Sequence, residues 1–182
     1  MNLDEKQISA EYIYKGKIIN LRRDEAMLPN GKTAFREVVE HNGGVCVVAL
    51  TENDEVLLVK QFRYPYFEQI LEIPAGKRDS LDEEPIECGI RELKEETGAV
   101  AKKIIPLGKL YPTPGYCGEI IWMYAATGLT FGDTNPDEDE FLKVVKIPLE
   151  ECVDMIISGE IKDAKTQTAV LKLKYLKDCG RI

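Results

Sequence analysis

The sequence predicts an α/β (α+β) protein, a sandwich built around a mixed β-sheet, and two observations support this prediction. Short runs rich in Val and Leu, such as Val45–Leu50 and Val56–Gln61, are typical of buried strands. A few segments show the longer apolar spacing of helices, and these do not alternate regularly with the strands. The pattern therefore favours a mixed sheet with some helices over a doubly wound nucleotide-binding fold.

The first part of the chain is predicted to be a set of short strands with a thin apolar face. Gly16 and the Pro29-Asn30-Gly31 run are turn signals between extended pieces. The expected strands are Tyr12–Lys15, Ile18–Arg22 and Thr33–Glu40. Because this stretch alone can bury little, we expect residues 1–42 to form an N-terminal strand segment that packs on the main body or on a second subunit.

Residues 43–182 are predicted to form the main domain. Further strands are expected at Ile70–Pro74, Ala101–Leu110, Ile120–Ala126 and Phe141–Pro148, and helices at Pro85–Thr97, Leu149–Ser158 and Asp163–Lys177. The first helix has the clearest signals, since Pro85 suits the first helical position and Gly98 suits the end. Its expected apolar stripe is formed by Ile86, Ile90 and Leu93.

The composition excludes several classes of protein. A net charge of −8 does not attract nucleic acid, so a polyanionic substrate must be met by local Arg and Lys or by metal. The five cysteines are scattered and odd in number, which favours reduced thiols over a disulfide framework or zinc site. The first twelve residues lack the apolar core of a secretion signal, and the longest apolar run, Gly43–Leu50, is too short to span a membrane. A cytoplasmic location is expected by elimination.

Three glutamates gather on one face of the predicted helix. Glu92, Glu95 and Glu96 stand at i, i+3 and i+4, where like charges destabilise a helix by a few tenths of a kcal/mol per pair. Solvent or a divalent cation can offset that repulsion, and carboxylate oxygens are natural ligands of Mg²⁺ and Mn²⁺. The charge spacing alone leaves open a solvated acidic helix face.

The residues around this helix favour a metal site over a solvated helix face, because residues 76–100 resemble the Nudix box. The box reads Gly-x5-Glu-x7-Arg-Glu-U-x-Glu-Glu-x-Gly-U, where U is aliphatic, and every fixed position from Glu83 to Gly98 matches. The one departure is the six residues, rather than five, between Gly76 and Glu83, which a loop can absorb. The chain thus resembles the Nudix hydrolase superfamily, which implies an α/β/α sandwich for residues 43–182.

The resemblance implies a divalent metal site that acts on a diphosphate. By position in the box, Glu92 and Glu96 are the first-choice ligands of two or three Mg²⁺ or Mn²⁺ ions, with the backbone carbonyl of Ala75 beside them. Glu95 adds a ligand or an outer contact. Arg91 orients the box through Glu83 or Glu95, so we count it with the catalytic residues.

Segments outside the box resemble the ADP-ribose pyrophosphatase branch of the superfamily. They are Val59–Pro65, Leu71–Lys77, Thr113–Tyr116 and Gly159–Thr166. Arg63 is therefore a candidate phosphate clamp, since a guanidinium offers a fork of donors to phosphate oxygens; a surface ion pair is the alternative. The other candidate substrate contacts by position are Arg36, Glu37, Gly76, Gly115 and Glu119. Arg36 and Glu37 could equally be an exposed pair on a strand.

The acidic run at residues 137–140 precedes the last predicted strand. By composition it is a solvated loop, whereas the resemblance makes Glu140 a third metal ligand and Glu138 the general base that activates water. The two residues could exchange these roles.

The expected activity is metal-dependent hydrolysis of ADP-ribose to AMP and ribose 5-phosphate. Another nucleotide sugar such as GDP-mannose, or a non-catalytic domain that binds a nucleotide sugar and regulates a partner, are the alternatives. The resemblance also implies a homodimer that exchanges N-terminal strands, with neither nucleic acid nor membrane as partner.

Overall fold

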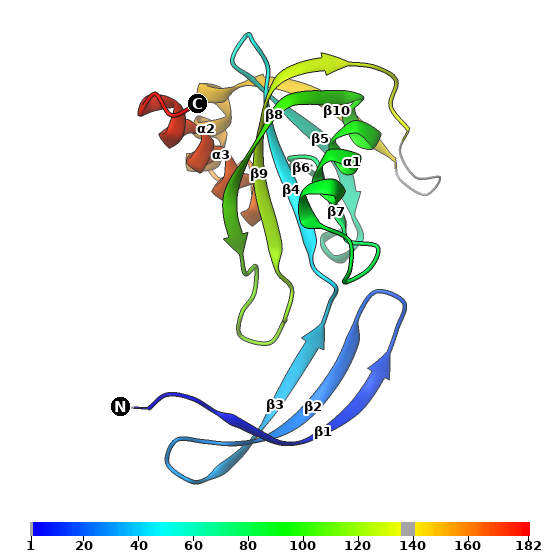
Figure 1. The fold of residues 1–182 in the computed structure, drawn as a ribbon, viewed down its shortest axis with the longest axis vertical. Coiled ribbons are helices and arrows are strands. Elements are labelled where there is room, and N and C mark those ends of the chain that lie inside the picture. The colour runs from blue at the N-terminus through cyan, green and yellow to red at the C-terminus, as the bar shows by residue number, and fades with distance from the viewer. Residues whose placement is uncertain (1, 136–140) are drawn as a thin grey trace. The chain divides into compact units, whose positions relative to one another are not determined.

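The computed structural model describes residues 2–135 and 141–182, which belong to two compact units. The first unit consists of Met1–Gly43 and Tyr111–Ile120, and the second of Gly44–Leu110 and Ile121–Ile182. Each unit has a β-sheet of its own (Figure 1). The second unit carries the predicted helix with Glu92, Glu95 and Glu96.

The first unit is an antiparallel sheet in the order β1 (Lys6–Lys15), β2 (Asn20–Met27) and β3 (Thr33–Glu40). The predicted turns are present: the backbone N–H of Gly16 donates to the Ile19 carbonyl at 3.0 Å, and Gly31 adopts a φ of +80° between β2 and β3. All ten residues of β1 are exposed. Within the described residues this strand therefore buries little surface, as the sequence predicts for the first part of the chain.

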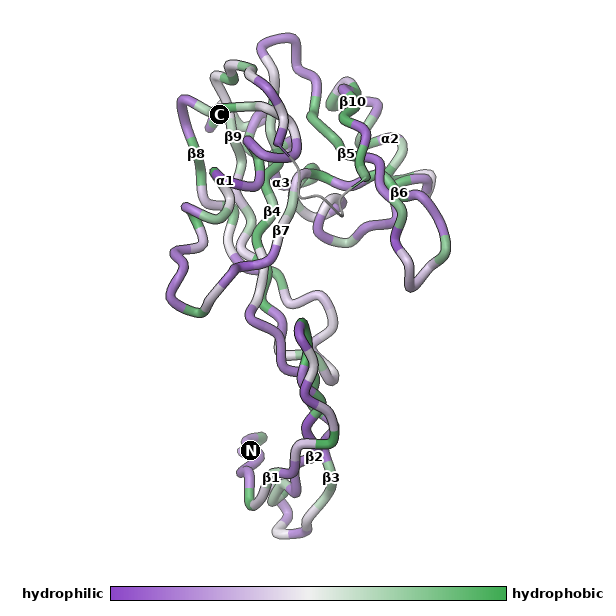
Figure 2. Tube along the Cα trace, turned by 90° about the vertical axis from the view of Figure 1, so that its right-hand side faces the viewer, coloured by the Kyte–Doolittle hydropathy of each residue, from purple (hydrophilic) through white to green (hydrophobic). Residues whose placement is uncertain are grey.

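Within the described ranges, the second unit contains a mixed 7-stranded sheet with the main order β10-β5-β4-β9-β8. The strands are β4 (Gly44–Leu50), β5 (Glu55–Arg63), β6 (Glu68–Glu72), β7 (Ala75–Lys77), β8 (Ala99–Leu110), β9 (Ile121–Phe131) and β10 (Leu142–Pro148). The central pair β4 and β9 is parallel, whereas the neighbouring pairs are antiparallel. Figure 2 shows the apolar character of β4, all of whose residues are buried.

The sheet divides at its centre, and this division positions the candidate site. Strands β4 and β5 pair only at Ala49–Leu57 and Leu50–Val56. Beyond these pairs β5 takes β6 as its neighbour and β4 takes β7. The short connection between β6 and β7 contains Ile73 and Pro74, so it lies where the two halves of the sheet separate.

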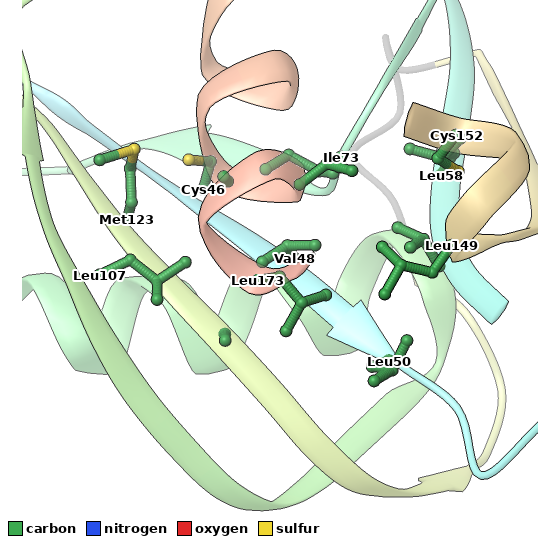
Figure 3. Close-up of a cluster of buried hydrophobic side chains, with 14 of the residues drawn as sticks. Cys46, Val48, Leu50, Leu58, Ile73, Leu107, Met123, Leu149, Cys152 and Leu173 are labelled. Carbon is green, nitrogen blue, oxygen red and sulfur yellow. The ribbon is translucent and has the colours of Figure 1, made fainter. Parts of the chain in front are cut away.

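Helices cover both faces of this sheet. α1 (Pro85–Thr97) packs on the face of β4 that presents Val45 and Val47. α2 (Leu149–Ile157) and α3 (Ala164–Asp178) pack on the other face, in a core that Figure 3 shows around Cys46, Val48 and Leu173. The predicted α/β/α sandwich around a mixed sheet is confirmed. None of the helices in the described part of the chain combines the length and apolar character needed to cross a membrane.

The apolar stripe expected on α1 is buried only at Leu93. Ile86 and Ile90 are 37% and 41% exposed. The buried face of the helix instead includes Glu92 and Glu96. These carboxylates face the β6–β7 turn, where backbone groups meet them, and this tertiary environment outweighs the local apolar pattern.

Candidate active site

Helix α1 is bounded by the residues that the sequence singles out. Pro85 occupies its first turn after Glu84, whose extended backbone begins the helix. Gly98 ends it with a φ of +68°, and its N–H donates to the Lys94 carbonyl at 2.8 Å. A side chain at position 98 would meet the Gly132 carbonyl oxygen 2.2 Å from its Cβ. Glycine is therefore required there both by backbone conformation and by space.

Two carboxylates of α1 lie against the β6–β7 turn. Glu92 and Glu96 are only 8% and 2% exposed. The backbone N–H of Ala75 donates to Glu96 Oε2 at 3.2 Å. A Cβ on Gly76 would stand 1.9 Å from Glu92 Cδ, so the backbone of this turn touches the carboxylate itself. Backbone atoms of Ala75 and Gly76 and the carboxylates of Glu92 and Glu96 are thus in direct contact.

Arg91 is surrounded by carboxylates. Its guanidinium donates to Glu92 at 2.8 Å, to Glu95 at 3.0 Å and to Glu83 at 3.2 Å. Burial disfavours its charge, but these carboxylates more than offset burial and raise the pKa of Arg91. The contacts with both Glu83 and Glu95 support the predicted orienting role of Arg91, which stays a prediction.

The loop before α1 accommodates the additional residue of the box. Arg78 is 9% exposed and donates through Nε to the Glu83 carbonyl at 2.9 Å and through Nη2 to the Leu81 carbonyl at 2.5 Å. Glu83 in turn accepts from the Asp79 N–H at 2.8 Å. Burial opposes ionisation of Glu83, yet this N–H and Arg91 hold its pKa below the usual value. The sequence analysis missed Arg78, for which the resemblance offers no motif position.

Arg63, the candidate phosphate clamp, forms an ion pair with the buried carboxylate of Glu72. Its Nε lies 2.5 Å from Glu72 Oε1, and its Nη2 lies 2.8 Å from Glu72 Oε2. Lys165 approaches the same carboxylate from the start of α3. The sequence analysis assigned no role to Glu72 or Lys165, although both lie in segments that carry the family resemblance.

The remaining candidates divide between the first unit and the undescribed segment. In the first unit, Arg36 Nη2 pairs with Glu5 at 2.6 Å, while Glu37 and Gly115 are exposed. Glu119 Oε1 lies 3.5 Å from His41 Nδ1. Glu138 and Glu140 lie outside the described residues, and so their roles as base and ligand stay predictions.

The donor chemistry of α1 and the β6–β7 turn fits a hard divalent cation. Mg²⁺ and Mn²⁺ take carboxylate oxygens, and Glu92 and Glu96 present such oxygens against the backbone of Ala75 and Gly76. Among the residues that the structure describes, no three Asp, Glu, His or Cys side chains converge as a complete metal site. The described residues therefore offer carboxylate oxygens of the kind that such an ion takes, but not a complete set of ligands.

Comparisons with known proteins agree with this geometry. A family model described as NUDIX domain matches residues 40–167, and one described as nucleoside diphosphate sugar hydrolase N-terminal domain matches residues 5–39. A Bacillus subtilis protein named ADP-ribose pyrophosphatase is 42% identical over 175 residues, 95% of this chain and 94% of that protein. A Bacillus methanolicus protein named methanol dehydrogenase activator is 39% identical over 176 residues, 96% of this chain and 93% of that protein.

A solved structure titled as an ADP compounds hydrolase has the same fold. It superimposes with a TM-score of 0.85 over 100% of both chains, at 23% identity. The chain therefore belongs to the Nudix family of hydrolases, and the assignment made from the box is confirmed. Nudix hydrolases generally require divalent metal ions, which fits the carboxylates of α1.

Proposed function

We propose that this enzyme hydrolyses the pyrophosphate bond of a nucleoside diphosphate sugar, and of ADP-ribose in particular, to AMP and ribose 5-phosphate. The observation that carries the proposal is the placement of Glu92 and Glu96 against the Ala75–Gly76 turn. It is supported by 42% identity over nearly the whole length of a protein named ADP-ribose pyrophosphatase.

Two or three Mg²⁺ or Mn²⁺ ions are the proposed cofactors. Glu92, Glu96 and the Ala75 carbonyl would hold them, with Glu140 as a further ligand and Glu95 as ligand or outer contact. Bound ions supply charge screening of the diphosphate and a lower pKa for bound water. Arg91 bridges the neighbouring carboxylates and offsets their repulsion, because its guanidinium donates to Glu92 and Glu95 at once.

The protein's own groups have two tasks in the reaction, to activate water and to hold phosphate. Glu138 removes a proton from the attacking water; the water oxygen bonds to one phosphorus, and the bridging P–O bond breaks. Arg63 holds phosphate oxygens with donors that Glu72 does not use. Asn135 donates its backbone N–H to the Glu95 carbonyl at 2.9 Å, which ties this part of the chain to α1.

The first unit is proposed to bind substrate and to form a homodimer with exchanged N-terminal strands. Arg36, Glu37, Gly115 and Glu119 are its proposed substrate contacts, together with Gly76 of the box. The full exposure of β1 and the match to a nucleoside diphosphate sugar hydrolase N-terminal model support a partner for residues 1–42. Light scattering during size-exclusion chromatography tests this, and a monomeric mass at micromolar concentration would contradict it.

The activity is tested by a phosphate-release assay with added phosphatase. The panel contains ADP-ribose, GDP-mannose and other nucleoside diphosphate sugars, each with Mg²⁺ or Mn²⁺. We expect Glu96→Gln to lose most activity and most Mn²⁺ binding while it stays folded, and Glu87→Gln, exposed on the same helix, to behave as wild type. Comparison of Glu138→Gln with Glu140→Gln separates base from ligand, because loss of the base leaves Mn²⁺ binding intact.

Two results would redirect the assignment. Turnover of GDP-mannose well above that of ADP-ribose would change the substrate but keep the chemistry. Binding of ADP-ribose without turnover of any nucleotide sugar would favour the regulatory alternative, which the similarity to a protein named methanol dehydrogenase activator brings into consideration. A cytoplasmic location is likewise a proposal, supported by five free cysteines.

A further inference from the structure

Four charged side chains meet where β6 ends and α3 begins. They are Arg63, Glu72, Asp163 and Lys165, and we call them the α3 charge cluster. Only 1% of the Glu72 side chain, 12% of Lys165 and 15% of Asp163 is exposed. Removing such charges from water costs several kcal/mol per ion unless partners offset it. Each ion pair in the cluster is therefore needed to keep its members buried.

The cluster forms a chain of contacts that ends at Arg63. Asp163 Oδ1 accepts from Lys165 Nζ at 3.0 Å, and Lys165 Nζ also donates to Glu72 Oε2. Glu72 then receives Arg63 through Oε1 at 2.5 Å and through Oε2 at 2.8 Å. Glu72 Oε2 is thus shared by the lysine and the arginine, and it couples the position of one cation to that of the other.

The backbone beside Glu72 is held by the same end of α3. Thr166 Oγ1 accepts the N–H of Ile73 at 2.9 Å and donates to Asp163 Oδ2 at 2.6 Å. Asp163 also caps the helix by accepting the Thr166 N–H at 2.9 Å. The carboxylate of Glu72 therefore has little freedom, because both its side chain and its peptide neighbour are bonded to α3.

Arg63 keeps donors available despite this attachment. A guanidinium has five N–H donors, and Glu72 engages Nε and one N–H of Nη2. Nη1 makes no hydrogen bond to any residue in the described ranges, and 39% of the side chain is exposed. Glu72 therefore holds the guanidinium at Nε and Nη2, while Nη1 remains available. This arrangement suits a planar group that must bind phosphate oxygens in one orientation.

The charge balance indicates what Lys165 contributes. Burial disfavours both Lys165 and Glu72 as ions, but Asp163 and Glu72 raise the pKa of the lysine, and Arg63 and Lys165 lower that of Glu72. The cluster holds two cations and two anions. Without Lys165, the carboxylates of Glu72 and Asp163 would have only the Arg63 guanidinium as a cation. Arg63 would then turn its remaining N–H donors toward these carboxylates.

We propose that Lys165 is a positioning residue which, through Glu72, orients Arg63 toward the phosphates of the substrate. This inference rests on the proposed function, because it takes Arg63 as the phosphate clamp. Lys165 lies behind Glu72 and does not itself hold substrate. Its loss should therefore weaken substrate binding more than the chemical step, which other residues perform.

The test is a steady-state comparison on the nucleotide sugar that the wild type hydrolyses best. We expect Lys165→Met to raise KM about tenfold, equivalent to the loss of one well-placed interaction, with a smaller change in kcat. Lys162→Met is the matched control: Lys162 pairs with Glu68 at 2.9 Å in an exposed position three residues away, and KM should stay unchanged.

A double-mutant cycle shows whether Lys165 acts through the arginine. Arg63→Gln should raise KM at least as much as Lys165→Met, and the double variant should match Arg63→Gln alone. The proposal would be overturned if the increase in KM of the double variant equalled the product of the two single increases. A KM of Lys165→Met equal to that of Lys162→Met would also overturn it. An unchanged KM in Arg63→Gln would overturn it as well, because Arg63 would then not bind phosphate.

A second variant and a binding measurement test the proposal even if Lys165→Met fails to fold. Glu72→Gln keeps the size of the side chain, and it should raise KM and again show no additivity with Arg63→Gln. Affinity for the α,β-methylene analogue of ADP-ribose in EDTA should fall in parallel, without metal or turnover. Wild type that hydrolyses no nucleotide sugar refutes the proposed function; active wild type with additive variants refutes only the role of Lys165.

Discussion

Replacement of Gly76 by alanine tests the proposed metal-binding role of the β6–β7 turn most directly. The new Cβ would stand 1.9 Å from Cδ and Oε1 of Glu92, whereas ordinary contacts begin at 3.4 Å. The carboxylate or the turn must therefore retreat by about 1.5 Å (3.4 − 1.9), and a misplacement of about 1 Å in an active site can cost 100-fold in rate. We expect Gly76→Ala to lose at least about 100-fold in kcat/KM, with weaker Mn²⁺ binding.

The same substitution should cost little stability. The displaced atoms are the end of a glutamate side chain that can rotate, so we expect the free energy of unfolding to fall by only about 1 kcal/mol. Gly118→Ala is the control, since its Cβ meets only the Val39 carbonyl oxygen, at 3.6 Å. Kinetics, Mn²⁺ titration and urea denaturation measure the three quantities. Activity of Gly76→Ala equal to that of Gly118→Ala would refute the reasoning.

Three further predictions concern residues around the site. Thr166→Val should lower the free energy of unfolding by about 1–3 kcal/mol, because the buried N–H of Ile73 loses its acceptor. Thr168→Val should change it less, because the half-buried Thr168 hydroxyl donates to the Ala164 carbonyl of its own helix at 2.8 Å. The pKa of Glu72 is lower in the folded protein than in the unfolded chain, so ionised Glu72 stabilises the fold above its unfolded pKa, and this stabilisation is lost as the pH falls through its folded pKa. The difference in unfolding free energy between wild type and Glu72→Gln should therefore shrink below about pH 4. A difference that stays constant with pH would contradict this. In native protein a thiol reagent should modify exposed Cys179 before the thiols whose pKa burial raises to about 12, namely Cys46, Cys88 and Cys152.

Local signals in the sequence were sufficient for helix α1 and its carboxylates. Pro85 and Gly98 mark the ends of the helix, and the helical period alone places Glu92 next to Glu96. The box between Gly76 and Gly98 then identifies the family, because its spacing is specific even with one additional loop residue. These features depend on neighbours within a few helical turns, which is why the sequence reveals them.

Long-range packing decided the environment of those carboxylates. The sequence places Ile86 and Ile90 on the apolar stripe of α1, but both are exposed, and the β6–β7 turn covers Glu92 and Glu96. No periodicity in the helix could predict this, because the partner group comes from another part of the sheet.

The α3 charge cluster also depended on tertiary structure. Glu72 and Lys165 are 93 residues apart, and so are Ile73 and Thr166. The sequence by itself determined the fold class, the family and the candidate ligands, because these follow from local pattern and spacing. Only the tertiary structure decided that a buried lysine supports the carboxylate that holds Arg63, because burial and ion pairing arise when distant segments pack together.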